Sequence, residues 1–282
     1  NDGVYEKTQM SKIITLFKEA KKNNKKIFIG FVTGGDPDYA SSKAIIKEMT
    51  KSCQIIEAGV SFNTSTSDSP IIMEANDRAI NSGMNMGKTF KLIKEVKRET
   101  KTNTCFVLMT YLNPVKIYGI KKFIKNCNLV GIAGVIIVDS NLNSPEEKVL
   151  LNGLSKNKIG YTKIISPTNS NQFIKQSIKN CNNSWLYITS YYGLTGSKNV
   201  NMSNVKKMVK KVRKYSKEIP IAVGFGVKTP SQVKQVAKYA DGVICGSTIV
   251  NKVSEGHKKR LKGKKLATFV SSYVKKLSHG VK

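Results

Sequence analysis

The stretch Ile27-Phe-Ile-Gly-Phe-Val32 is a short apolar run, followed by the turn-forming segment Thr33-Gly-Gly-Asp-Pro37 and then by a helix-like stretch. Such a run, ending in small or polar residues, is typical of a strand buried on both faces of a parallel sheet. The unit recurs along the chain, and its eight apolar runs are Ile27–Val32, Gln54–Val60, Thr104–Thr110, Gly134–Asp139, Tyr161–Pro167, Ser184–Ser190, Ile219–Gly226 and Gly242–Ser247.

Eight strand-then-helix units in about 250 residues is the count of a (β/α)8 barrel, an α/β fold. We therefore expect one barrel domain over residues 1–282, with an extra entry helix within residues 1–25 and a closing helix over 266–277. The other helices are expected at Ser41–Ser52, Asn85–Glu99, Ile120–Asn128, Ser144–Lys156, Asn171–Lys179, Val205–Lys217 and Ser231–Tyr239.

The formal net charge of +30 is the most unusual global property. A strongly positive charge is typical of proteins that bind a phosphate-rich partner such as nucleic acid. However, only four of the 48 basic residues are Arg, which usually reads base edges and phosphates, so compositional drift towards Lys is favoured and nucleic-acid binding is not expected as a role. No apolar stretch is long enough to cross a bilayer, so no membrane association is predicted.

Cysteine and histidine usage excludes several chemistries. The five Cys are scattered without metal-ligand spacing, which favours buried free thiols in a reducing compartment. Both His, at 257 and 279, follow the last apolar run, so Ser-His or Cys-His catalysis and histidine zinc sites are not expected, and no metal is predicted. Residue 1 is Asn, and we expect that a segment upstream has been removed.

Two carboxylates are candidates for catalysis. Glu57 lies within the apolar run Gln54–Val60, where burial would raise its pKa and suit it to acid–base chemistry. The alternative is a structural carboxylate paired with a lysine. Asp68 lies in the long loop after this run and could face Glu57 across a substrate, but Asp68-Ser-Pro70 is also a good helix start, and Asp68 could equally be a loop cap.

Glycines follow the last strands. The seventh run ends in Val223-Gly-Phe-Gly-Val227, the eighth in Cys245-Gly-Ser247, and the sixth is followed by Gly193-Leu-Thr-Gly196. Backbone N–H groups exposed at such turns bind phosphate at the mouth of many barrels. We therefore expect a phosphorylated ligand. Asp36 is interpreted as part of a turn and helix cap, whereas Tyr111, Asn113 and Tyr187 are expected near the barrel mouth.

Taken in order, these pieces resemble the tryptophan synthase alpha subunit family. The resemblance runs from about residue 11 to residue 276. It is carried by the segments Phe31-Val-Thr-Gly-Gly-Asp-Pro37, Ile55-Ile-Glu-Ala-Gly-Val60, Leu108-Met-Thr-Tyr-Leu-Asn-Pro114, Val135-Ile-Ile-Val-Asp139, Gly193-Leu-Thr-Gly196, Val223-Gly-Phe-Gly226 and Asp241-Gly-Val-Ile-Cys-Gly-Ser247.

The resemblance implies a reaction and partners. Family members cleave indole-3-glycerol phosphate to indole and glyceraldehyde 3-phosphate, a retro-aldol lyase reaction without a cofactor. Indole then passes to a beta subunit that holds pyridoxal phosphate, in an alpha2beta2 complex. Relatives are found in the plastid stroma or in the bacterial cytoplasm, and we expect this chain in one of these compartments.

The resemblance also implies residue roles. Glu57 matches the acid–base group and Asp68 the carboxylate that stabilises charge on the indole nitrogen. The positions that match the phosphate site are Gly196, Gly226, Gly246 and Ser247, those that match the indole pocket are Phe31, Leu108 and Tyr187, and the one that matches the loop-closing threonine is Thr195.

The departures from the family pattern are concentrated in the loop Ser61–Pro70, which lacks two prolines, a glycine and an aspartate of the usual motif. Fewer prolines increase the entropy lost when a loop closes. The segment Ser140–Asn143 and the residues before Gly193 also differ, and these regions face the beta subunit in the family. An alternative to an active lyase is therefore a weakly active or non-catalytic alpha-like protein that acts as a binding or allosteric partner.

Overall fold

The computed structural model describes residues 11–63, 68–140, 144–189, 202–224 and 226–281. Within them, parallel strands pair in the order of the sequence, and β8 returns to β1 to close a barrel. The strands are β1 (Ile27–Thr33), β2 (Ile55–Gly59), β3 (Cys105–Thr110), β4 (Gly134–Ile137), β5 (Gly160–Ile165), β6 (Leu186–Thr189), β7 (Ile221–Gly224) and β8 (Gly242–Cys245).

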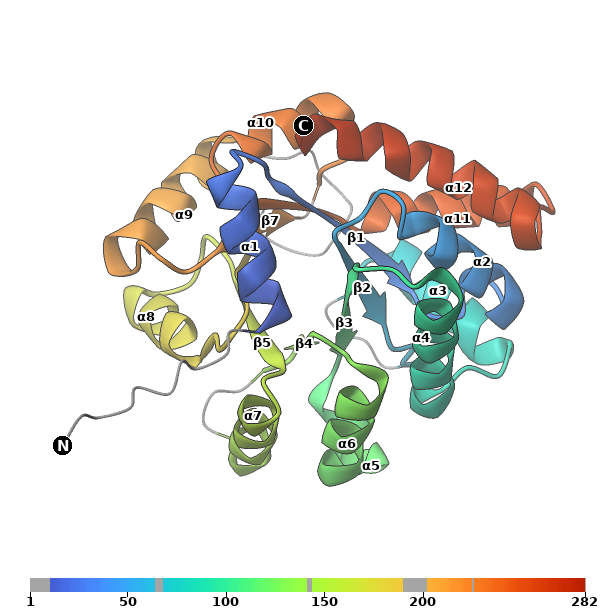
Figure 1. The fold of residues 1–282 in the computed structure, drawn as a ribbon, viewed down its shortest axis with the longest axis horizontal. Helices are drawn as coiled ribbons and strands as arrows, with labels where there is room; N and C mark the ends of the chain where they lie inside the picture. The colour runs from blue at the N-terminus through green and yellow to red at the C-terminus, as the bar shows by residue number, and fades with distance from the viewer. Residues whose placement is uncertain (1–10, 64–67, 141–143, 190–201, 225, 282) are drawn as a thin grey trace.

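Helices surround this barrel (Figure 1). They are α1 (Lys12–Lys22), α2 (Tyr39–Met49), α3 (Pro70–Asn81), α4 (Met86–Thr100), α5 (Leu112–Tyr118), α6 (Ile120–Val130), α7 (Pro145–Lys156), α8 (Asn171–Asn180), α9 (Met202–Tyr215), α10 (Pro230–Ala237), α11 (Ser247–Lys258) and α12 (Gly263–Ser278), with a final 3-10 turn at His279–Val281.

The predicted (β/α)8 barrel is confirmed, and each predicted strand and helix overlaps an observed one. Three helices were not predicted: α3 and α5, which follow β2 and β3, and α11, which follows β8. For α3 the sequence indicated only a helix start at Asp68-Ser-Pro70, whereas α5 and α11 begin within two residues of a strand end, where the pattern indicates a loop. Two of these additional helices, α3 and α11, pack on Phe31 at the carboxyl end of the barrel, so they matter for the site.

Side chains of each strand alternate between an inner and an outer layer. Ile27, Ile29, Ile55 and Val107 belong to the inner cluster, whereas Phe28, Ile56 and Leu108 pack with the helices in the outer one. Parallel strands covered on both faces need apolar residues at successive positions, which explains the near-continuous apolar runs.

Helix α1 covers the amino-terminal end of the barrel (Figure 1). Its apolar face inserts Ile13 and Phe17 into the inner cluster, and the ring of Phe17 lies 6.0 Å from that of Trp185. Ser11 begins the helix by accepting a hydrogen bond from the N–H of Ile14. The predicted entry helix therefore closes the floor of the barrel, and the carboxyl end is left for the site.

In the described residues, no helix has the length and apolar character needed to cross a membrane. The five cysteines are free thiols, and four of them are buried, as predicted from their scatter.

We predict that Phe17→Ala lowers the free energy of unfolding by about 3–5 kcal/mol, because it empties the space that the ring fills against Trp185. Urea unfolding followed by circular dichroism measures this change. Lys22→Ala, at an exposed position on the same helix, is the control and should change stability by less than about 0.5 kcal/mol. Equal effects of the two substitutions would contradict the conclusion that Phe17 packs into the amino-terminal end of the barrel.

Candidate active site

Glu57 is a carboxylate in the inner layer of the barrel. It pairs in register with Phe31 on β1 and Val107 on β3, and only 1% of its surface is exposed. Neither carboxylate oxygen has a hydrogen-bond partner among the described residues. Burial therefore raises its pKa to about 8, so this group holds its proton at neutral pH. The sequence left open whether a lysine neutralises Glu57, and no such ion pair forms in the described part of the chain.

Tyr187 lies on β6, in the same inner cluster. Burial raises its pKa well above the ordinary value, and the nearby charge of Glu57 adds to this effect. Its hydroxyl lies over Gly224 at the end of β7, where a Cβ would be only 2.5 Å from the Tyr187 Oη. Glycine at 224 therefore makes room for this phenol inside the barrel.

Phe31 closes one side of the mouth. It packs with Ile72 and Ala75 of α3 and with Val250 of α11. Its ring also occupies the space beside Gly59, because a Cβ there would be 2.8 Å from the Phe31 Cζ. The extra helices after β2 and β8 thus meet over the inner residues of β1.

The prediction that Leu108 lines the pocket is wrong. Leu108 is fully buried in the outer layer, among the helices, because its neighbours Val107 and Met109 point to the other face of β3. Met109 contacts both the inner cluster and the cluster around Phe31. The two-residue period of the strand, counted from an inner residue such as Val107, would have identified Met109.

Asp68 is half-buried and directly precedes α3. The N-cap of that helix is Ser69, and Pro70 is its first residue, so Asp68 lies one residue before the cap. Asn76, one helical turn and a half into α3, donates a hydrogen bond of 3.3 Å to Asp68 Oδ2. The carboxylate is thus placed at the start of the helix that packs on Phe31.

A buried ion pair, which sequence reasoning missed, holds α3 against the loop after β1. Arg78 donates to both carboxylate oxygens of Asp36, over 2.7 and 3.0 Å. Asp36 is 3% exposed, and burial raises its pKa while the guanidinium opposes that shift. The cap of α2 is instead Asp38, which accepts from the N–H of Ser41, so the interpretation of Asp36 as a cap is wrong.

The ends of β7 and β8 contribute backbone rather than side chains. Gly226 has a φ of +78°, a conformation that favours glycine. Gly246 is the N-cap of α11, Ser247 is its first residue, and no side chain of the described residues caps this helix end. The predicted glycine turns are therefore at the carboxyl end of the barrel. Thr195 and Gly196 lie outside the described residues.

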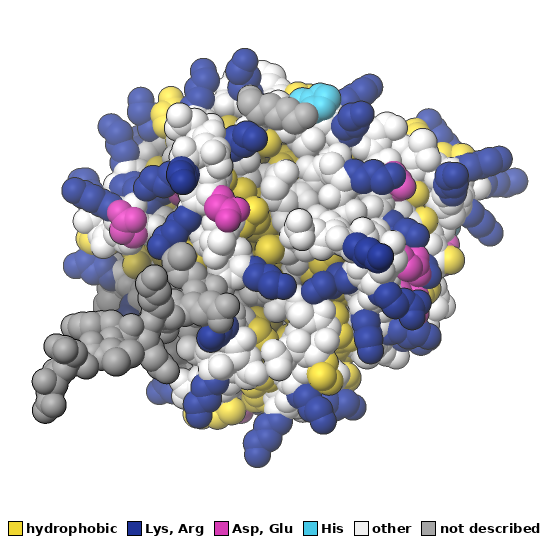
Figure 2. Space-filling view, viewed as in Figure 1, with side chains coloured by type: hydrophobic (Ala, Val, Ile, Leu, Met, Phe, Trp, Pro, Cys, Tyr) yellow, Lys and Arg dark blue, Asp and Glu magenta, His cyan; other side chains and the backbone are white. Residues whose placement is uncertain are grey.

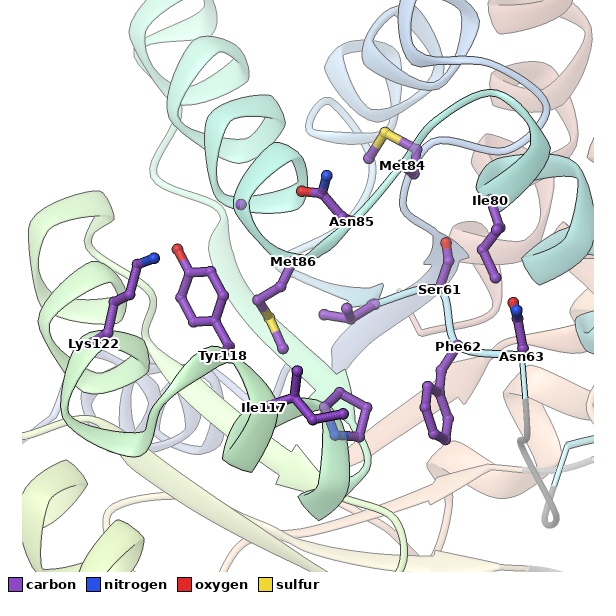
Figure 3. Close-up of a pocket in the computed structure, with 13 residues that line it drawn as sticks. Ser61, Phe62, Asn63, Ile80, Met84, Asn85, Met86, Ile117, Tyr118 and Lys122 are labelled. Carbon is purple, nitrogen blue, oxygen red and sulfur yellow. The ribbon is translucent and has the colours of Figure 1, made fainter.

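A separate pocket of about 680 Å³ lies on the outer side of the segment that follows β2 (Figure 3). Phe62 and Asn63 line one end, Tyr118 and Lys122 the other, and Met86 lies between them (Figure 3). Ile117 at its edge is 77% exposed. Glu57, Phe31 and Tyr187 are not among its lining residues, so this pocket is distinct from the barrel interior.

A closed barrel with a buried carboxyl group in its inner layer, below a mouth bordered by extra helices, is typical of the enzymes that carry their active site at the carboxyl end of a (β/α)8 barrel. In the described residues, no group of three or more His, Cys, Asp and Glu side chains could hold a metal ion. Residues 17–279 match the family profile of the tryptophan synthase alpha chain. The chain belongs to this family, and it is a carbon–carbon lyase of tryptophan biosynthesis that cleaves indole-3-glycerol phosphate.

Individual relatives agree with this assignment. The tryptophan synthase alpha chain of Petrotoga mobilis is 37% identical over 248 residues, which cover 87% of this chain and 92% of that protein. The alpha chain of Desulfatibacillum aliphaticivorans is 35% identical over 270 residues, covering 95% and 98%. Among solved structures, the alpha subunit of Legionella pneumophila superposes with a TM-score of 0.85 at 26% identity, covering 97% and 99%. Tryptophan synthase of Mycobacterium tuberculosis gives 0.84 at 27%, with the same coverage.

We predict that Glu57 makes stability fall with rising pH. Its pKa rises from 4.5 to about 8 on folding, so its contribution is complete below pH 4.5 and is lost as the pH approaches 8. Relative to Glu57→Gln, the wild type should lose about 3 kcal/mol of unfolding free energy between pH 5 and pH 8. Urea unfolding of both proteins across this pH range tests whether the difference in unfolding free energy falls as the pH rises. Parallel curves would show that the group is not buried as described.

We also predict that Arg78→Ala costs about 3–5 kcal/mol of unfolding free energy, because it leaves Asp36 as a buried carboxylate without its cation. Thermal and urea unfolding give this value. Arg98→Ala, which removes an exposed arginine of α4, serves as the matched control. A loss below 1 kcal/mol for Arg78→Ala would exclude the ion pair as the main attachment of α3.

Proposed function

We propose that this chain cleaves indole-3-glycerol phosphate with Glu57 as the acid–base group and Asp68 as the carboxylate that stabilises positive charge on the indole ring. The observation that carries the proposal is the unpartnered carboxyl group of Glu57 in the inner layer, whose pKa of about 8 keeps a proton available. A group with a pKa near the working pH can both give and take a proton in one catalytic cycle.

In the proposed steps, Glu57 gives up one proton and then takes a second proton from the substrate. Protonated Glu57 delivers its proton to C3 of the indole ring, which leaves a positive charge on the ring nitrogen. The resulting carboxylate removes the proton from the glycerol hydroxyl next to this carbon. The bond between C3 and the glycerol carbon then breaks, its electron pair returns to the ring, and indole and the aldehyde of glyceraldehyde 3-phosphate are released. Glu57 ends the cycle protonated.

Asp68 is proposed to face the ring nitrogen while that charge exists. Its position before α3 supports this role, because α3 packs on Phe31, a proposed wall of the indole pocket. Preorganised charges act most strongly at positions where charge develops in the transition state. Asn76 and the Asp36–Arg78 pair would hold the carboxylate and its helix in place.

The phosphate is proposed to bind at the ends of β7 and β8. The glycine conformation at Gly226 and the uncapped start of α11 at Gly246 and Ser247 support this, because free N–H groups at a helix start attract anions. Met109 joins Phe31 and Tyr187 as a proposed part of the pocket wall in place of Leu108. Gly196 and Thr195 keep their predicted roles in phosphate binding and loop closure.

The cleavage needs proton transfer and charge stabilisation only, so we propose no cofactor for this chain, and pyridoxal phosphate would belong to a beta partner. The partner is proposed to cover the pocket beside Phe62 and Asn63, whose apolar rim includes the exposed Ile117 (Figure 3). Ser61 and Asn63, at the start of the loop that departs from the family pattern, line this pocket, so altered contacts with the partner are part of the proposal.

We predict that Glu57→Gln and Asp68→Asn each lower indole release from indole-3-glycerol phosphate by about 10²–10⁴-fold, because each removes a group that acts in the transition state. The assay is run on the purified chain, with and without an added tryptophan synthase beta subunit. Glu74→Gln and Asp77→Asn, at exposed positions of α3, are the matched controls and should retain near-wild-type rates.

Retention of the wild-type rate by either site variant would contradict the role proposed for that residue. Silence of the wild type in both assays, with binding of a phosphate ligand retained, would instead support the alternative of a non-catalytic binding partner.

A further inference from the structure

Acidic residues are distributed much less evenly along this chain than basic residues are. Residues 148–282 contain 27 of the 48 Lys and Arg but only three of the 18 Asp and Glu, namely Glu218, Asp241 and Glu255. In a barrel built in sequence order, these residues form one contiguous side, from within α7 round to α12 (Figure 1). Drift towards Lys explains why Lys replaces Arg, but it does not explain why acidic residues are so few on this side.

The other side shows the contrast. Lysines of α2 pair there with glutamates of α4, as in the contacts of Lys43 with Glu95 and Glu99 at 3.2 and 3.1 Å and of Lys47 with Glu99 at 2.7 Å. These two lysines are therefore neutralised locally, as expected of an ordinary solvated surface.

Helix α9 forms the centre of the opposite surface, where Glu218 and Asp241, the latter paired with Arg213, are the nearby acidic residues among those described. It and the following turn expose Lys206, Lys207, Lys210, Lys214 and Lys217, and none of them forms a salt bridge within the described residues. The apolar side chains of α9, such as Val205 and Val212, are turned inward. Lysines four residues apart on a helix follow one another at about 6 Å along its axis, comparable with the separation of neighbouring phosphates in an extended strand.

Two neighbouring helices continue this surface. Exposed lysines occur at 175 and 179 on α8 and at 234 and 238 on and after α10. Side-chain contacts join the helices, because the ammonium of Lys175 lies 5.0 Å from the ring of Tyr215 at the end of α9, and that of Lys206 lies 5.8 Å from the ring of Tyr239 after α10. Figure 1 shows α8, α9 and α10 in succession on one side of the barrel, and Figure 2 shows how few acidic side chains accompany the basic ones on the visible face.

Two aromatic rings are exposed among these lysines. Tyr215, the last residue of α9, and Tyr239, after α10, are 36% and 40% exposed, and a lysine ammonium lies over each ring. The aliphatic side chains that are most exposed in the described residues, such as Ile117 and Leu129, lie on α5 and α6 instead. Within the described residues, this surface thus offers cations and flat rings but no large exposed aliphatic side chain for insertion into a bilayer or for a protein contact.

We propose that the surface of α8, α9 and α10 binds single-stranded nucleic acid, with the lysines of α9 along the phosphates and with Tyr215 and Tyr239 stacking on bases. Cations along a strand with exposed aromatic rings between them are the features of sequence-tolerant single-strand binding. Lysine suits this role because reading of base edges, for which Arg is preferred, is not required. The proposal differs from the expectation drawn from composition alone, which did not consider where the acidic residues lie.

The test measures fluorescence anisotropy of labelled 20-residue oligouridine and of a duplex of the same length, at KCl concentrations from 50 to 200 mM. The triple variant Lys207→Gln, Lys210→Gln, Lys214→Gln removes three charges from α9. The matched control Lys94→Gln, Lys121→Gln, Lys125→Gln removes three charges from exposed positions of α4 and α6. Both proteins should keep the lyase rate of the wild type, which checks the fold, because neither changes a residue of the proposed active site.

The α9 variant should bind oligouridine at least tenfold more weakly than the wild type. The slope of its log association constant against log KCl concentration should fall in magnitude by about two. The affinity of the control variant should stay within threefold of that of the wild type. The double variant Tyr215→Leu, Tyr239→Leu should weaken binding of oligouridine about fivefold or more but leave binding of heparin unchanged. Equal losses in the two triple variants would overturn the proposal in favour of diffuse attraction. Preferential binding of the duplex or of phosphatidylserine vesicles, or an equal effect of the tyrosine variant on heparin, would also overturn it.

Discussion

Closure of the barrel is the constraint on which the rest of the molecule depends. Once β8 pairs with β1, every strand residue points either to the inner layer or to the helices. No edge strand remains at which a side chain could turn to solvent instead. Glu57 falls in the inner layer by this alternation, between Phe31 and Val107. Its carboxyl group is therefore desolvated by the fold itself, and the chemistry of the site follows from a packing requirement rather than from a special loop.

The mouth of the barrel is organised by helices that the strand–helix repeat does not require. Helix α3 brings Asp68 to the rim, packs on Phe31 and is held by the ion pair between Arg78 and Asp36. Helix α11 starts at the end of β8 and meets α3 over Phe31. The barrel thus holds the proposed acid–base group, while the added helices place the proposed second carboxylate and the uncapped helix start around it.

Much of this could be read from the sequence, and the reasons for the failures are physical. Buried parallel strands leave continuous apolar runs, so the barrel and the position of Glu57 within it were predictable. The resemblance placed Leu108 in the pocket wall, one residue away from Met109, and the continuous apolar runs, which hide the period of two, gave no local signal against it. The partners Asp36 and Arg78 are 42 residues apart, and no local pattern connects them. The sign of the net charge follows from the composition, but the distribution of the charged residues over the surface can be determined only from the fold.

The close approach of Tyr187 to Gly224 has an evolutionary consequence. Any residue with a Cβ at 224 would collide with the phenol, and a shorter side chain at 187 would leave a void next to Glu57. The two positions lie on neighbouring strands, β6 and β7, and neither can drift alone without a loss of packing. The two positions are therefore expected to covary. Among descendants of this chain, a substitution at one should be accompanied by a compensating substitution at the other.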